Sequence, residues 1–574
     1  MFPLIWTVRL EVRPVFFSGG SVANAGKMGL DLLEIIKINI LLFEVLSNED
    51  KRLQIRHEEF LVGELKSEVD RAFRQITFRY WLGIWFQFPR LKRYILVPAS
   101  HITPLQRTNI NTALSSIAAM ARMPRRPAAP NDVESAEYAS CKGKRMSLTA
   151  SVQTVPVPEP ELTPDAMIER AIALRPRLLA EQDETERRSV HSEAIHEEFR
   201  KAGFYRCLQP RRFGGYEFDL KTYYRIAIEI ARGDPSVAWC LIVGSGHALM
   251  LGSYFGEEAQ AAGFGPDGNF SAPSVAAPTG TATPIDGGWL VKGKWGYASG
   301  APYATHFMPS VLITENPAQK PRAGIALVPR AQWKMLDDWG AILGMRGSGS
   351  NSIVIEGARV PRSHVIALDM LNVPLAGGTP GSRLHGNPMY AGRCLSFFHA
   401  ELVAVLAGLG YAAIDEYEKI IRTKTTLYPP IVPRYQHHDY QRYLGLALGM
   451  MSAAKRLVLN AGDVYMDLCR RGIEGGEPFT MEEDLELFAS LEHGGRLAWE
   501  AVEMLFRTSS SSGAKDGERM QRYYRDASIY RGHLSAQYDI AAQRLALVHL
   551  GLNHGIATED RTGVGNTPGS GREK

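Results

Sequence analysis

Apolar and polar residues follow a helical period in the part of the chain after residue 158. Over residues 163–203, apolar side chains recur at helical spacing among mixed charges, and residues 219–262 repeat the pattern with more apolar positions. Thr163-Pro164 predicts a helix start, and Asp234-Pro235 predicts a cap between two helices. We therefore predict a helical domain over residues 159–265.

The pattern then changes to short β-rich runs separated by Gly, Pro and Asn. Asp286-Gly287 is a hairpin signal within this stretch. We predict a β domain over residues 266–375, with strands in the runs 288–293, 307–314, 324–329 and 352–360.

Long helical patterns resume at about Met389, after a loop rich in Gly and Pro over residues 374–388. The runs 402–409 and 444–451 are too uniformly apolar for surface helices, and they predict a bundle core or an oligomer core. We predict a C-terminal helical bundle over residues 376–555 and a polar tail over 556–574. The fold class is therefore α+β: a helical domain, a central β domain and a helical bundle.

Composition and charge divide the chain at about the same place. The 574 residues are 45% hydrophobic and 22% charged, which is ordinary for a globular protein, and the net charge of +4 is too small to indicate a nucleic-acid partner. Residues 1–150 hold 21 Lys/Arg and 14 Asp/Glu, a balance of +7, which leaves −3 for the rest. We interpret residues 1–158 as an N-terminal extension of uncertain status, with Met146 as an alternative start.

The extension predicts neither a membrane anchor nor a secretory signal. Its apolar runs fall short of the ~18–20 residues that a span requires, and the ordered parts of a signal peptide are absent. The five cysteines contain no CxxC pair, so we expect no zinc site and a cytoplasmic location.

Two glycine patterns resemble nucleotide-binding motifs, but their setting does not support that use. Gly263–Gly268 leaves a helix through a turn, and Gly408–Ala413 lies within helical sequence, whereas a dinucleotide fingerprint follows a strand and opens a helix. The chain has no Walker A, HExxH or GxSxG motif, so no nicotinamide or ATP site of its own is evident.

Three segments carry more specific information. They are Gly293-Lys-Trp-Gly-Tyr-Ala-Ser-Gly300, Gly344-Met-Arg-Gly-Ser-Gly-Ser-Asn351 and Tyr523-Tyr-Arg-Asp-Ala-Ser-Ile-Tyr-Arg-Gly-His533, the last expected on a late helix. Their order and their helical–β–helical setting resemble the acyl-CoA dehydrogenase superfamily over roughly residues 160–552.

The resemblance implies a flavin cleft between the β domain and the helices, in a homotetramer built on the bundle. It places Trp295 and Ser299 beside the isoalloxazine ring. Arg346, Ser348 and Ser350 suit flavin phosphate or ring oxygens, since Arg gives charge-assisted contacts. Strand packing for Trp295, turn chemistry for Ser350 and a structural ion pair for Arg525-Asp526 are the simpler alternatives.

The chain departs from the dehydrogenases where they carry their catalytic base. Their Tyr-Arg-Asp-Ala-Lys-Ile-Tyr-x-x-Tyr-Glu pattern places that Glu on Leu534 and the preceding Tyr on His533, and Leu cannot remove a proton. The family's Gly-Gly-x-Gly-Tyr loop is replaced by Arg507–Gly513. These departures resemble the two-component flavin-dependent monooxygenases of the same fold, such as the hydroxylases of 4-hydroxyphenylacetate and related phenols.

That branch implies an oxygenase that receives reduced FMN or reduced FAD from a separate flavin reductase and uses O2 as co-substrate. A flavin hydroperoxide, with Ser299 as a hydrogen-bond donor to the ring edge, then hydroxylates a small aromatic substrate. We expect His533 to accept the phenol proton, His247 to be a second active-site histidine and Ser271 to be a weaker candidate for the substrate wall.

Three other functions remain open. They are an acyl-CoA dehydrogenase with a relocated base, a monooxygenase of sulfur or nitrogen, and a non-catalytic binding protein on this fold.

Overall fold

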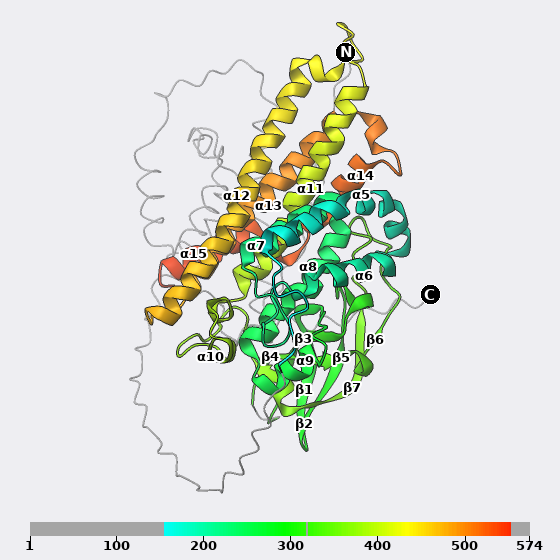
Figure 1. Ribbon diagram of the computed structural model, residues 1–574. Coiled ribbons are helices and arrows are strands. Elements are labelled where there is room, and N and C mark those ends of the chain that lie inside the picture. The colour runs from blue at the N-terminus through cyan, green and yellow to red at the C-terminus, as the bar shows by residue number, and fades with distance from the viewer. Residues whose placement is uncertain (1–153, 317–318, 553–574) are drawn as a thin grey trace, which may run out of the picture. The chain divides into compact units, whose positions relative to one another are not determined.

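The computed structural model describes residues 154–316 and 319–552. Residues 1–153 of the N-terminal extension, which include the alternative start Met146, and the predicted tail 556–574 lie outside the described residues. Within the described part, helices come first, then a sheet, then long helices, so the predicted α+β class is confirmed (Figure 1).

The first helical part begins at the predicted caps. The helices are α5 (Pro164–Arg188), α6 (Glu193–Ala202), α7 (Leu220–Gly233), α8 (Pro235–Tyr254) and α9 (Glu257–Phe264). The Thr163 side chain caps α5, and the Asp234 side chain accepts the backbone N–H groups of Ser236 and Val237 at the start of α8. Both caps were predicted from the Pro at the first helical position.

One mixed sheet follows, in the order β6-β7-β2-β1-β3-β4-β8, with β5 paired to β3. Its strands are β1 (Ser274–Ile285), β2 (Gly288–Trp295), β3 (His306–Ile313), β4 (Arg322–Ala326), β5 (Val328–Pro329), β6 (Lys334–Met335), β7 (Ile353–Pro361) and β8 (Val365–Ala367). The β1–β2 hairpin turns at Asp286-Gly287, as predicted, with Gly287 at φ +76°. The one parallel pair among these strands is β1 with β3.

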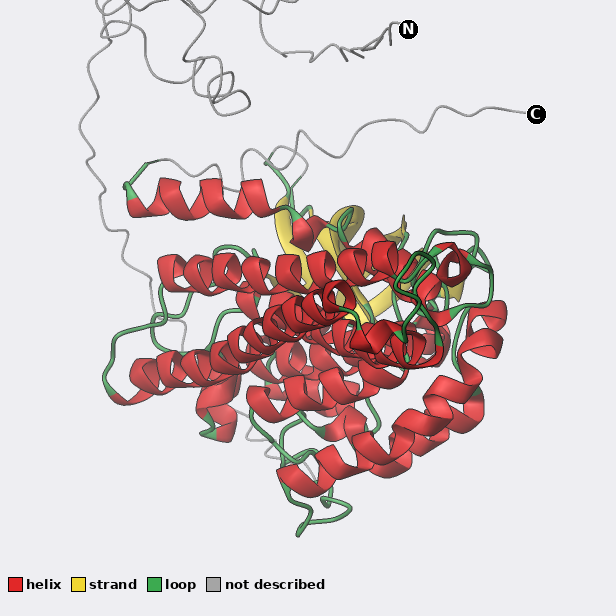
Figure 2. Cartoon of the chain, turned by 90° about the horizontal axis from the view of Figure 1, so that it is seen from above, coloured by secondary structure: helices red, strands yellow, loops and turns green. Residues whose placement is uncertain are grey.

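The C-terminal helices are α10 (Pro380–His385), α11 (Leu395–Thr423), α12 (His438–Glu474), α13 (Met481–Thr508), α14 (Arg519–Tyr530) and α15 (Tyr538–His549). The short α10 lies inside the segment expected to be a loop, where a capping box between Thr379 and Ser382 stabilises it. Figure 1 shows α11, α12 and α13 as long neighbouring helices, consistent with the extensive packing among them, and Figure 2 shows from above that long helices make up most of the described part.

Two helices, α8 and α11, are long and apolar enough to cross a membrane. However, 94% and 89% of their most apolar windows are buried inside the protein. Both belong to the helical core, which is distinct from the smaller core of the sheet. The Gly408–Ala413 pattern lies within α11, where a Cβ on Gly408 would come within 2.4 Å of the Ile228 carbonyl of α7. This glycine therefore allows α11 to pack closely against α7.

Candidate active site

A chain of hydrogen bonds joins α8 to the turn after β2 and to the 344–351 loop. Trp239 Nε1 donates to Ser299 Oγ over 3.1 Å, Ser299 Oγ lies 2.8 Å from Ser350 Oγ, and Ser350 Oγ lies 2.7 Å from Ser348 Oγ. All four residues are buried. The structure thus brings three predicted hydroxyls together and adds Trp239, whose place in an apolar helix gave no specific signal.

The Ser299 turn is held by the backbone around it. Gly300 adopts φ +82°, and a Cβ there would approach the Cys240 carbonyl of α8 to 3.0 Å. The preceding Tyr297 is at φ +60° and is 70% exposed. A non-glycine residue in this conformation costs free energy, so the surrounding structure must hold this turn.

His247 lies in the interior of α8, and its tautomer follows from its partners. Its Nδ1 is 2.6 Å from the Val243 carbonyl and 2.8 Å from the Ala272 carbonyl, so Nδ1–H donates to them. Burial lowers the pKa of His247 to about 4. The ring is therefore neutral at pH 7, and Nε2 has a lone pair available to accept a proton or a hydrogen bond.

Ser271 is next to this histidine in the fold. It precedes Ala272, which receives the Nδ1–H of His247, and a Cβ on Gly244 of α8 would lie 2.9 Å from Ser271 Oγ. The hydroxyl therefore faces α8 at the turn that carries His247. The structure brings these two predicted residues together.

His533 is not on a helix, in contrast to the sequence expectation. Helix α14 ends at Tyr530, and His533 caps the short turn Leu534–Ala536. Its Nδ1 accepts the backbone N–H of Ser535 over 3.1 Å, so in the neutral ring Nε2 carries the proton and can donate.

The His533 ring lies in a crowded but solvent-exposed place. The His533 and Trp239 rings are nearly perpendicular, with centroids 5.5 Å apart, and this contact connects His533 to the Trp239 that donates to Ser299. Desolvation by the surrounding protein and the charge of His399 lower the pKa of His533 to about 4.

Two other predicted residues, Trp295 and Arg346, contact groups of the protein itself that account for their positions. Trp295 is fully buried in the core of the sheet, where its Nε1 donates to the Ser310 carbonyl over 3.0 Å and its ring covers Gly280. It therefore supports the Ser299 turn from behind, and in this conformation it offers no surface to a ligand. This corrects the expectation that Trp295 lies beside the isoalloxazine ring.

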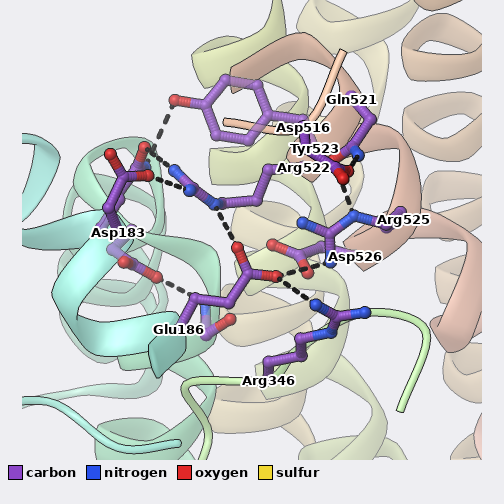
Figure 3. Close-up of polar contacts among 12 residues, drawn as sticks. Asp183, Glu186, Arg346, Asp516, Gln521, Arg522, Tyr523, Arg525 and Asp526 are labelled. Atoms are coloured by element: carbon purple, nitrogen blue, oxygen red, sulfur yellow. Dashed lines mark hydrogen bonds and ion pairs between the residues drawn. The ribbon is translucent and has the colours of Figure 1, made fainter. Parts of the chain in front are cut away.

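Arg346 takes part in an ion-pair network rather than facing an open cleft (Figure 3). Glu186 of α5 forms ion pairs with three arginines: Arg346 at 3.5 Å, Arg522 at 3.1 Å and Arg525 at 2.6 Å. Burial opposes the ionisation of Glu186, but Arg525 and Arg522 outweigh it and hold the pKa of this carboxyl below its usual value.

The network fixes the 344–351 loop against α14. Arg525 donates to the Leu343 carbonyl over 2.9 Å, and Asp526 accepts the Met345 N–H over 2.5 Å. Arg525 and Asp526 therefore have structural contacts, but the ion pair of Arg525 is with Glu186 and Asp526 instead accepts a backbone N–H. The result is that Ser348 and Ser350 reach the Ser299 turn in a defined position.

The residues around this hydroxyl chain fit a flavin. Ser350 lines a surface pocket of about 200 Å³ together with Tyr297, Trp339 and the backbone of residues 338–342. Exposed aromatic surface beside hydroxyl groups suits a planar ring with polar edges. Ser350 lines the pocket and would hold such a ring, and Ser299 lies 2.8 Å from the Ser350 hydroxyl.

The N-terminal and C-terminal helical parts match known domain families. Residues 170–267 match the acyl-CoA dehydrogenase N-terminal domain, and residues 401–538 match the acyl-CoA dehydrogenase C-terminal domain.

Two curated relatives and one solved structure are similar over most of the described residues. A pigment production hydroxylase of Rhodococcus sp. is 29% identical over 398 residues, which are 68% of this chain and 98% of the relative. The oxygenase subunit of a flavin-dependent monooxygenase, HsaA of Rhodococcus jostii, is 26% identical over 64% of this chain and 93% of its own length. The structure of XiaF from Streptomyces sp. in complex with FADH2 and glycerol aligns with a TM-score of 0.63 at 20% identity, over 68% of this chain and 96% of that one.

Proposed function

We propose, from the premise that the chain belongs to the acyl-CoA dehydrogenase superfamily and to its flavin-dependent monooxygenases, that it hydroxylates a phenolic substrate. Reduced flavin and O2 are its co-substrates, and a separate flavin reductase supplies the flavin. The observation that supports the proposal is that α8 carries both Trp239, which donates to Ser299 and contacts the His533 ring, and His247, whose Nδ1 donates to two backbone carbonyls.

The tautomers of the two histidines make one a proton acceptor and the other a hydrogen-bond donor. His247 accepts the phenol proton at Nε2, because its Nδ1–H is already committed to two carbonyls. His533 donates from Nε2–H, because its Nδ1 accepts the Ser535 N–H. This reverses the order expected from the sequence, in which His533 was the first choice for the base.

Bound reduced flavin supplies two electrons, so that one atom of O2 enters the aromatic ring and the other leaves as water. Ser299 would hold the flavin edge, and Trp239 fixes the Ser299 hydroxyl by donating to it. Removing the phenol proton makes the ring a better nucleophile, and the buried walls around His247 keep water away from the reacting atoms.

One experiment tests this proposal. The anaerobic protein is mixed with chemically reduced FMN or FAD and a panel of simple phenols, oxygen is admitted, and oxidised flavin, hydrogen peroxide and hydroxylated product are followed. We expect a delay before oxidised-flavin absorbance appears, and product formation at the expense of peroxide. Immediate reoxidation with stoichiometric peroxide and no product would overturn the proposal.

We further infer a homotetramer built on the C-terminal bundle. The outer face of α12 exposes Gly445, Leu446, Leu448 and Gly449, an apolar surface in the run predicted to be a core. Light scattering should give a mass of about four chains, and Leu446→Ser/Leu448→Ser should lower it. A monomeric wild-type protein would contradict this inference.

We propose a cytoplasmic location for the enzyme. The four cysteines among the described residues are free and buried, which suits a reducing compartment. Fractionation of the source cells, with activity followed in each fraction, tests it; recovery of the protein outside the cytoplasm would contradict it.

A further inference from the structure

A small pocket lies where α6 meets the segments 205–206, 268–271 and 303–305, and none of its lining residues belongs to the hydroxyl chain. Its volume of about 50 Å³ holds roughly four water molecules, so it suits one polar group of a ligand better than a whole aromatic molecule. Two arginines, Arg200 and Arg206, line it, and none of the described residues in its lining is acidic. The chemistry of the pocket therefore favours an anionic group.

Arg206 brings a positive charge to this pocket without forming an ion pair. Its Nη1 donates to the Gly214 carbonyl over 2.9 Å and its Nη2 donates to the Asp267 carbonyl, and none of the ion pairs among the described residues involves this arginine. Burial lowers the pKa of Arg206, and the Asp267 carboxylate, which accepts the Asn269 amide, opposes this from a longer distance. A partly desolvated guanidinium of this kind would be stabilised by an anionic ligand.

The guanidinium is held in a defined position. Gly214 at φ +80° and Gly268 at φ +66° leave room for it, since a Cβ on either glycine would lie 2.8 Å or 2.4 Å from Arg206 Nη1. The two backbone carbonyls use two of the five N–H groups of the side chain, which leaves three to donate to a ligand.

Holding the turns together does not explain the charge. The neighbouring Gln209 joins the same two turns with a neutral amide, because its Nε2 donates to the Phe213 carbonyl over 2.5 Å and to the Gly268 carbonyl over 3.0 Å. A neutral donor is therefore sufficient for this structural task, and the positive charge of Arg206 is available for another one.

The remaining walls of the pocket are rings and neutral polar groups. The His196 and Tyr303 rings stack with their centroids 4.2 Å apart, and His196 Nδ1 lies 2.9 Å from the Tyr205 hydroxyl. Burial lowers the pKa of His196 to about 4, so this ring is neutral at pH 7. Arg200 is exposed and pairs with Glu197 of its own helix at 2.9 Å, so the two arginines are the charged groups of the lining.

Ser271 connects the pocket to the candidate active site. It lines the pocket, and its backbone N–H donates to Thr305 Oγ1 over 3.1 Å. Its hydroxyl lies against α8 beside Gly244, and the next residue, Ala272, accepts the Nδ1–H of His247. The pocket and the proposed proton acceptor therefore share one wall.

We propose that this pocket binds a carboxylate group, with Arg206 as its main donor and Arg200 as a second cation at the exposed end. The carboxylate belongs either to the aromatic substrate or to a separate small acid. The first source rests on the proposed function and makes the substrate a phenolic acid, with its hydroxyl at His247 and its carboxylate beyond Ser271.

The experiment measures binding without flavin, on the full-length protein. Isothermal titration calorimetry compares 3-(4-hydroxyphenyl)propanoate with its primary amide, and acetate serves as the smallest probe. We expect the acid to bind at least about tenfold more tightly than the amide, because the amide cannot accept charge-assisted hydrogen bonds as a carboxylate does. Equal affinities of the wild-type protein for acid and amide would overturn the inference.

Variants locate the effect at the two arginines. Arg206→Gln should remove the preference for the acid, and Arg206→Lys should keep part of it, because Lys retains the charge but not the planar fork. Arg200→Gln should lower the affinity for the acid several-fold. The control Arg211→Gln changes an exposed arginine outside the pocket lining and should leave the preference unchanged.

Melting temperatures separate these effects from a loss of structure. Arg206→Gln retains a side-chain amide that can donate to the carbonyls of its turns, and Arg200→Gln alters an exposed side chain that pairs within α6. Both variants should therefore melt within a few degrees of the wild type. An undiminished preference for the acid in both folded variants would overturn the assignment of the pocket.

Hydroxylation assays with reduced flavin and O2 distinguish the two sources of the carboxylate. If the acid gives at least about tenfold higher kcat/KM than the amide and acetate competes with it, the carboxylate is that of the substrate. If acid and amide are hydroxylated equally while acetate still binds through Arg206, the pocket takes a separate acid. If neither compound is hydroxylated but the calorimetric preference persists, the proposed function fails and the carboxylate site stands.

Discussion

The two histidines of the candidate site are held in opposite ways. His247 is in the interior of α8, is buried, and donates to two backbone carbonyls. His533 follows the end of α14, is exposed, and is oriented by one backbone N–H and by ring contacts. A group fixed by helix geometry keeps its place whatever binds beside it, whereas a group after a helix end depends on its neighbours. We therefore expect proton acceptance, which needs a precisely placed group, to depend on His247. His533 should have a supporting role that its neighbours can adjust.

The largest expected effect separates the two histidines directly. His247→Ala should lower hydroxylated product by at least about a hundredfold while flavin still reoxidises, because the proton acceptor is lost. His533→Ala should lower product by about tenfold. The measurement is product and peroxide formed per reduced flavin. Equal losses in both variants would break the comparison.

The next prediction concerns the ion pairs of Glu186, which fix α14, the helix that precedes His533. Glu186→Gln removes a carboxylate that forms ion pairs with three arginines. These ion pairs fix α14 and the 344–351 loop to α5. We expect a loss of about 2 kcal/mol in the free energy of unfolding by urea, since hydrogen bonds to charged groups contribute on this scale. The matched control is Glu184→Gln, whose carboxylate pairs with arginines at the surface and should cost under about 0.5 kcal/mol. Equal losses would show that the network is not structural.

The third prediction tests the Ser299 hydroxyl, which links Trp239 of α8 to Ser350 of the 344–351 loop. Ser299→Ala removes the acceptor of the Trp239 Nε1–H and one partner of Ser350. We expect a several-fold rise in peroxide per flavin with little change in melting temperature. The control is Ser528→Ala on α14, whose hydroxyl bonds within its own helix. Unchanged coupling in Ser299→Ala would remove this serine from the flavin edge.

The smallest effect concerns stability against pH. Burial lowers the pKa of several histidines to about 4, including His196, His247, His306 and His385, and that of His191 to about 3. The unfolded chain binds these protons below about pH 6.5, so stability is lost as pH falls from 6.5 towards 4. Four buried carboxyls oppose this, because burial raises the pKa of Asp234 to about 7, those of Asp484 and Asp526 to about 6, and that of Glu401 well above its usual value.

We expect the histidines to dominate by number, so that the melting temperature falls between pH 6.5 and 4.5. His247→Asn should make this fall shallower by a few degrees. A melting temperature that rises on acidification would show that the buried carboxyls dominate.

Local pattern was enough to predict much of the fold. The caps at Thr163 and Asp234, the hairpin at Asp286-Gly287 and the long C-terminal helices are set by short-range chemistry, and the structure confirms them. The motif segments, through their resemblance to a family, also indicated the monooxygenase class that the relatives support. Residue type and spacing carry this information because capping, turn conformation and periodicity act over a few residues.

Tertiary structure alone decided which side chains meet and in which state. The sequence gives no reason for Trp239 to reach Ser299 across 60 positions, or for His399 to pair with Glu492 on another helix. It placed Trp295 at a ligand surface, where packing against Gly280 instead buries it, and it could not assign the tautomers of His247 and His533. Those outcomes depend on which backbone groups and charges surround each ring, and that is fixed only when distant segments pack together.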